Sequence, residues 1–96
     1  MGQNDGERDL PLKAQPYSRT ASFTEDTVPD ALLRDHTTKP GVWGVITVER
    51  GRLELTRTET GATHVLSPGN PATVAPGEKH HVSIVGDVCF HVEFWR

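Results

Sequence analysis

Short runs of alternating apolar and polar residues, separated by turn-forming residues, cover the chain from residue 42 to its end. Such runs are typical of β-strands, in which successive side chains point to opposite faces of a sheet. The predicted strands are 42–48, 53–56, 64–66, 72–74, 82–84 and 88–95. Glycine, proline, asparagine and aspartate occupy many of the positions between them. Strands this short, at this spacing, predict an all-β sandwich or barrel.

The chain before residue 42 has a different character. Residues 1–15 are polar and lack apolar periodicity, so we expect a flexible tail, because too little apolar surface is available to offset the entropy of ordering. Residues 17–23 resemble an edge strand, and residues 27–34, with Pro29 near their start, suit a short helical turn. We therefore expect a tail at 1–15 and a single domain at 16–96. Gly51 predicts a tight hairpin between two of the strands.

Composition and charge exclude several classes of protein. The net charge is -3 at pH 7 without a cluster of Lys and Arg, so nucleic acid is not an expected partner. No apolar run approaches the roughly 20 residues that span a bilayer, and no signal peptide begins the chain, so we expect no membrane partner and a cytoplasmic location. Cys89 is the single cysteine, which fits a reducing compartment. A chain of 96 residues has a small core, which a bound metal or a homodimer interface would reinforce, and we expect a homodimer.

The candidate chemistry is centred on the turn that precedes the strand at 82–84. Pro76 and Gly77 predict this turn, and His81 follows the proline by five residues, a spacing similar to that of the second sequence motif of the cupin superfamily. A histidine delivered to the start of a barrel strand points its imidazole inward and can bind a metal. His80 must face the other way in an extended strand. The sequence therefore predicts His81, and not His80, as the metal ligand.

Other candidates lie before the first long strand and in the last one. His36 stands in a polar loop and is a second possible nitrogen ligand. His91 and Glu93 share one face of the last strand, opposite an apolar row. They line the pocket if that row packs against the N-terminal arm or a partner subunit, and they face outward if the row fills the interior. Lys39 would attract an oxyanion at the pocket mouth or is simply an exposed loop lysine, and Trp43 would pack in the core or stack on a substrate.

Two stretches are the most specific parts of the sequence: Lys39-Pro40-Gly41-Val42-Trp43-Gly44 and the ending Val92-Glu93-Phe94-Trp95-Arg96. Together with Leu32-Leu33, His36, Val48-x-x-Gly51-x-Leu53 and Pro76 to His81, they resemble the TehB/YeaR-like family of small cupins over residues 17–96. The resemblance implies a cupin-type double-stranded β-helix, or jelly-roll, barrel with a short N-terminal helical turn, a pocket at one end and a link to tellurite or nitrosative stress. Related domains also occur in front of a methyltransferase, but this chain has no glycine-rich nucleotide loop, so methyl transfer is not expected.

These observations support three hypotheses. The first is a small metal-binding cupin that binds a small molecule or oxyanion, with His36, His81, His91 and Glu93 as candidate ligands of a divalent Zn, Fe, Ni or Mn ion. The second is a metal-dependent oxygenase or isomerase in which His36, His81 and Glu93 hold the metal as a Lewis acid. The third is a metal-free dimeric binding module.

Overall fold

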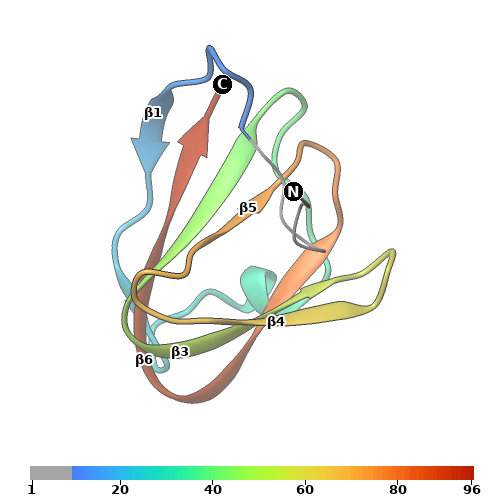
Figure 1. The fold of residues 1–96 in the computed structure, drawn as a ribbon. Helices are drawn as coiled ribbons and strands as arrows, with labels where there is room; N and C mark the ends of the chain where they lie inside the picture. The colour runs from blue at the N-terminus through green and yellow to red at the C-terminus, as the bar shows by residue number, and fades with distance from the viewer. Residues whose placement is uncertain (1–9) are drawn as a thin grey trace.

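Two long strands organise the fold in the computed structural model, which describes residues 10–96. β3 (Trp43–Arg57) and β6 (His80–Trp95) pair antiparallel along nearly their whole length. β4 (Ala62–Leu66) and β5 (Ala72–Val74) also pair with β3, whereas β1 (Pro16–Arg19) and β2 (Phe23–Thr24) pair with β6. Within the described residues, these strands form one antiparallel sheet, as Figure 1 shows.

Both long strands bend near their middle, so the sheet folds over on itself (Figure 1). The pairing of β3 with β6 changes register between Val48 and Arg50 and again between Gly51 and Leu53. Such bulges bend a strand and increase its twist. Gly51 has a φ of 82°, and a Cβ at this position would collide with the carbonyl oxygen of Asp87. The predicted hairpin at Gly51 is therefore wrong, because a continuous strand bends there instead of reversing.

Because the sheet folds over, its two halves lie against each other. Residues 43–48 of β3 pair with the end of β6 and with β5, whereas residues 53–57 pair with the start of β6 and with β4. Alternate side chains from both halves point inward and form the core. The core contains Ile46, Val48, Leu53, Leu55, Leu66, Ala72, Val74, Val82, Val88, Phe90 and Val92. The alternation seen in the sequence thus becomes the inner face of a folded sheet.

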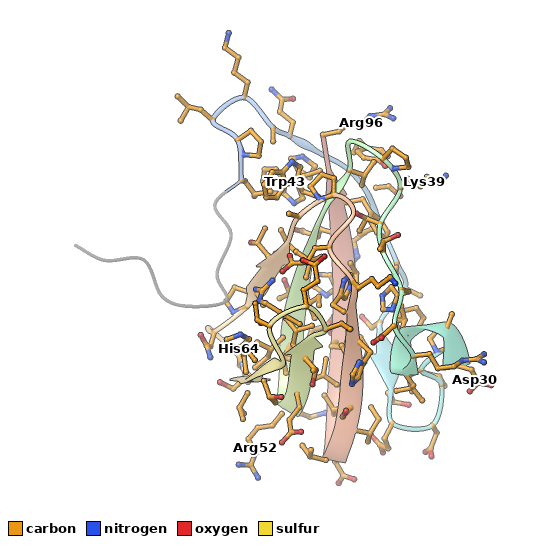
Figure 2. The ribbon with its side chains drawn as sticks, turned by 90° about the vertical axis from the view of Figure 1, so that its right-hand side faces the viewer. Asp30, Lys39, Trp43, Arg52, His64 and Arg96 are labelled. Carbon is orange, nitrogen blue, oxygen red and sulfur yellow. The ribbon has the colours of Figure 1, made fainter. Side chains whose placement is uncertain are left out.

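Residues 25–42, called the β2–β3 segment below, cover the open side of this folded sheet. The segment includes the 3-10 helix η1 (Asp30–Leu33), and Figure 2 shows it running beside the sheet from Asp30 to Lys39. Its backbone is joined to β6 where His36 and His80 exchange two hydrogen bonds of 2.9 and 3.0 Å. The predicted helical turn at 27–34 is thus a shorter 3-10 turn.

The all-β prediction is confirmed, whereas the described strands make one connected sheet and no closed barrel. Part of the expected tail, residues 1–9, lies outside the described residues. At its other end, Gln15 exchanges two backbone hydrogen bonds of 3.1 Å with Arg96 next to β1. No helix among residues 10–96 has the length and apolar character needed to cross a membrane.

Candidate functional site

A cavity of about 470 Å³ lies between the inner face of the sheet and the β2–β3 segment. Most of its wall is apolar, with Phe90, Val74 and Ile46 among the most buried residues of the chain at 0%, 1% and 3% exposure. Most of the polar lining comes from residues 17–20 and the β2–β3 segment, which supply hydroxyl groups, His36 and Lys39, and β6 adds His80. Ligand sites in proteins commonly have this size and this mixture of an apolar wall with a few polar groups.

His36 and His80 form a pair of imidazoles in the cavity wall. Their ring centroids are 4.2 Å apart, and the ring planes are inclined by 58°. The Nδ1 atom of His36 lies 2.8 Å from the carbonyl oxygen of Arg34, and that of His80 lies 2.8 Å from the carbonyl oxygen of Glu78. Because a carbonyl oxygen only accepts hydrogen bonds, each Nδ1 carries the proton and donates it. In the neutral ring the lone pair is then on Nε2, available to a donor or a cation.

Burial keeps His80 neutral. His80 is only 3% exposed, and desolvation lowers the pKa of its imidazole, although the hydrogen bond to the Glu78 carbonyl opposes this shift. The neighbouring His36 and Arg57 also disfavour a second positive charge here. His80 therefore presents a neutral nitrogen acceptor at neutral pH.

The structure corrects the expectation that His81 faces the interior. His81 does not line the cavity, and its Nδ1 donates a hydrogen bond of 2.9 Å to Asp35 Oδ1 on the outer side of β6. The Thr58 hydroxyl donates to the same oxygen at 2.7 Å, and these two bonds, with Thr58 contributing most, lower the pKa of Asp35. The alternation of the strand explains the outcome, because Val82 is buried and His80 shares its face.

His91 and Glu93 also lie on the outer face of β6. Of the two orientations that the sequence allows, the structure has the one in which the apolar row of this strand, with Phe90 and Val92, fills the interior. The Nδ1 of His91 donates to Glu49 Oε2 at 2.6 Å, and the Ser22 hydroxyl donates to the same oxygen at 2.7 Å. The Ser22 bond, followed by the His91 bond, lowers the pKa of Glu49 to about 2. Glu93 accepts a bond of 3.3 Å from Trp95 Nε1.

The two remaining candidates, Lys39 and Trp43, also differ in whether they line the cavity. Lys39 lines the cavity from the β2–β3 segment. Trp43 does not line it and is the register partner of Trp95 at the other end of the β3–β6 ladder. Side chains alternate along β3, and the positions of Gly44 and Ile46 point inward. Trp43 therefore points to the opposite face.

The expected four-ligand metal set is therefore not assembled. Nowhere in residues 10–96 do three or more His, Cys, Asp or Glu side chains gather in a way that could hold a metal ion. Of the four candidate metal ligands, His36 alone lines the cavity, and its neighbour there is His80. Two Nε2 atoms with a fixed tautomer are suitable nitrogen donors, but the facial set of His36, His81 and Glu93 needed by the oxygenase or isomerase hypothesis is dispersed over two faces.

The chain is similar to proteins of one known family. Residues 18–92 match the TehB-like domain family. The chain belongs to the TehB-like family. The probable S-adenosyl-L-methionine-dependent methyltransferase TehB of Haemophilus influenzae is 33% identical over 76 residues, which are 74% of this chain and 27% of that protein. The chain thus spans about a quarter of the length of this curated relative.

Solved structures agree with the assignment of this TehB-like domain. The crystal structure of TehB from Haemophilus influenzae superposes with a TM-score of 0.79 at 29% identity, covering 88% of this chain and 32% of TehB. A protein from Escherichia coli K12 superposes with a TM-score of 0.84 at 19% identity, covering 93% of this chain and 96% of the other. At this identity the second likeness concerns the fold alone.

Sequence reasoning missed a buried ion pair in this TehB-like domain. Arg57 is 2% exposed, and its Nη1 donates to both carboxylate oxygens of Glu78 at 3.0 Å. Its Nη2 donates to the Thr73 carbonyl at 3.0 Å, which ties the end of β3 to β5. The signal was available, because Arg57 continues the inward series of Leu53 and Leu55 at a spacing of two residues.

Proposed function

We propose that this TehB-like domain is a binding module that takes a small molecule into the cavity between the sheet and the β2–β3 segment. The observation that carries the proposal is the apolar cavity of about 470 Å³ with the His36 and His80 imidazoles in its wall. An interior of this size with few polar groups is suited to an organic ligand. A bent sheet with its cavity inside also supports classing the fold as an open relative of the cupin barrel.

Methyl transfer is not part of the proposal. The relative whose name includes this activity is matched over 27% of its length, and the described residues of this chain form one antiparallel sheet. Nucleotide-type cofactors are commonly bound by open parallel sheets flanked by helices, which this part of the chain lacks. The expected link to tellurite or nitrosative stress, the homodimer and the cytoplasmic location stay predictions.

Titration of the isotope-labelled protein with octanoate and 1-octanol, followed by NMR of the backbone amides, tests the binding module. We expect shifts at lining residues such as Val82 and Phe90 and none at the exposed Val65 of β4. Val92→Phe places a phenyl ring in the cavity wall and should abolish the shifts, whereas Val65→Phe should leave them unchanged. Absence of binding by both probes to a folded wild-type protein would contradict the proposal.

A second candidate function is metal binding at the His36 and His80 pair. The observation in its favour is that backbone carbonyls hold both Nδ1 protons, so both Nε2 lone pairs are available to a divalent cation. Two protein ligands leave several coordination positions to water or a bound molecule. Zn or Ni would suit imidazole nitrogen, and the metal would then act as a Lewis acid beside the apolar cavity.

Elemental analysis of protein purified without chelator and then reconstituted with Zn or Ni tests this candidate. We expect His80→Ala to remove the metal and His81→Ala to retain it, because His80 lines the cavity whereas His81 bonds to Asp35 outside it. The two variants alter neighbouring residues of one strand, so they are matched in chemistry and position. A wild-type content below about 0.1 ion per chain after reconstitution would exclude metal binding, since nitrogen sites for these ions bind tightly.

A further inference from the structure

The described cavity lining contains a positively charged side chain and no negatively charged one. Among the residues that the structure describes, eighteen line the cavity and none of them is Asp or Glu, although the whole chain carries a net charge of -3. Lys39 is the single lysine or arginine in this lining. A cavity with an ammonium group and no carboxylate in its wall favours negatively charged ligands over positively charged ones.

Three carboxylates of the neighbouring segments are engaged away from the cavity. Glu25 accepts a hydrogen bond of 2.9 Å from the backbone of Val88, and Asp35 is bound by Thr58 and His81 on the outer side. Glu78 is paired with Arg57. These contacts fix carboxylates that could otherwise turn toward a ligand and oppose the ammonium of Lys39.

A second cation lies at the Lys39 end of the molecule. Figure 2 shows Lys39 and Arg96 at the same end, and Asp30 lies well away from both. The guanidinium of Arg96 is 4.0 Å from the centre of the Tyr17 ring, and Tyr17 lines the cavity. Arg96 therefore adds a second positive charge at the end of the molecule that carries the exposed Lys39.

The apolar wall and the two imidazoles of the cavity are unsuited to an anionic group. Phe90, Val74 and Ile46 offer no hydrogen bonds. His36 and His80 present nitrogen acceptors in their neutral forms, and burial lowers the pKa of His80. A carboxylate beside these lone pairs would be repelled, so the head group of an anionic ligand has its favourable place near Lys39.

We propose that the ligand of this TehB-like domain is an amphipathic organic anion, such as a medium-chain carboxylate, with its apolar body among Ile46, Val74 and Phe90 and its head group at Lys39. This inference rests on the proposed binding module and adds the class of ligand and its orientation. Lys39 is then the residue that determines specificity for charge, whereas the apolar wall supplies most of the affinity.

Three probes with the same carbon chain test the inference: octanoate, 1-octanol and octylamine, titrated into EDTA-treated wild-type protein. Octanoate should bind most tightly and octylamine most weakly. Lys39→Met should weaken octanoate by about fivefold, as expected for an ion pair at a solvent-exposed rim, and should change 1-octanol by less than about twofold. The matched control Lys79→Met, an exposed lysine outside the cavity, should leave all three affinities within about twofold of wild type.

The outcomes separate the inference from the proposed function. If 1-octanol or octylamine binds as tightly as octanoate, or if Lys39→Met weakens all probes equally, the anionic ligand class is wrong and the binding module stands. If no probe binds, the binding module itself fails. Added NaCl provides an independent readout, because salt should weaken octanoate alone through screening of the Lys39 contact.

Discussion

The two faces of β6 use histidine in opposite ways. On the inner face, His80 lines the cavity and donates its Nδ1 proton to a backbone carbonyl. On the outer face, His81 and His91 donate theirs to the carboxylates of Asp35 and Glu49 at 2.9 and 2.6 Å. The outer imidazoles are thus engaged in holding distant segments together, whereas the inner one is held by local backbone and keeps a nitrogen for a ligand. A shift of one residue along a strand decides between these roles.

The carboxylates on the two faces differ in exposure. Arg57 and Glu78 on the inner side are 2% and 9% exposed, whereas Asp35 and Glu49, the carboxylates bound by His81 and His91 on the outer side, are 46% and 37% exposed. A buried ion pair has lost its hydration and depends on the partner that remains, but water compensates an exposed carboxylate when its contact is broken. The comparison therefore predicts a large structural role for the inner pair and smaller roles for the outer ones.

The largest expected effect is that of Arg57→Met. Removal of the guanidinium leaves the Glu78 carboxylate without its cationic partner and frees the Thr73 carbonyl, so the free energy of unfolding should fall by about 3–5 kcal/mol. Urea denaturation measures this loss. Arg52→Met, at an exposed arginine of the same strand shown in Figure 2, is the matched control and should stay within about 0.5 kcal/mol of wild type.

A second variant keeps this prediction informative. Glu78→Gln in the Arg57→Met background removes the charge of the Glu78 carboxylate and retains an acceptor for the Ala75 amide, which in the wild-type protein bonds to Glu78 Oε1 at 3.0 Å. The double variant should recover part of the lost stability. Equal losses for Arg57→Met and Arg52→Met would mean that the buried pair of Arg57 and Glu78 does not have the large structural role proposed.

An intermediate effect is expected from acid. The pKa of Glu49 is lowered in the folded protein from 4.5 to about 2, so its stabilising contribution is complete above pH 4.5 and is lost as the pH falls toward 2. Urea unfolding midpoints at about pH 5.5 and about pH 3 should therefore differ, with the lower stability in acid. Glu49→Gln keeps a hydrogen-bond acceptor without a titrating charge, so the difference between the two pH values should shrink.

The exposed Glu59 supplies the control for this pH series. Glu59→Gln should retain the wild-type difference between the two pH values, because the stabilising contacts of Ser22 and His91 are made to Glu49. An unchanged pH dependence in Glu49→Gln would show that the outer cluster contributes nothing to acid sensitivity. Asp35, whose pKa is also lowered, accounts for part of the remaining dependence.

The sequence pattern was sufficient to predict the faces of the strands but not their continuity or the identity of the inward histidine. Alternation alone put Phe90 and Val92 on one side of β6 and His91 and Glu93 on the other, as the structure has them. Gly51 indicated a turn because a positive φ is typical of tight hairpins, but pairing resumes on both sides of it and a bulge results. Local residue preference does not distinguish these two outcomes.

The candidate site was predicted less well, because it depends on contacts between distant parts of the chain. His81 was predicted from its spacing to Pro76. Alternation along the strand instead puts His80 on the same face as the buried Val82. His36 and His80 are joined by a β-bridge although they are 44 residues apart in the sequence, and the local pattern around either residue does not reveal this contact. Lys39 was placed near the pocket mouth from its loop position, and the absence of carboxylates from the described cavity wall emerges only once the chain is folded.

The smallest effect is expected from His81→Ala. Asp35 loses one donor but keeps the Thr58 hydroxyl at 2.7 Å, and His36 and His80 still exchange backbone hydrogen bonds that hold the β2–β3 segment. The unfolding midpoint should therefore fall less than in Arg57→Met, and octanoate affinity should stay within about twofold of wild type, because the imidazole does not reach the cavity. Calorimetric titration with octanoate measures this affinity. If His81→Ala weakened octanoate by more than about twofold, the outer imidazole would control the cavity through the β2–β3 segment, and the separation of roles between the two faces would not hold.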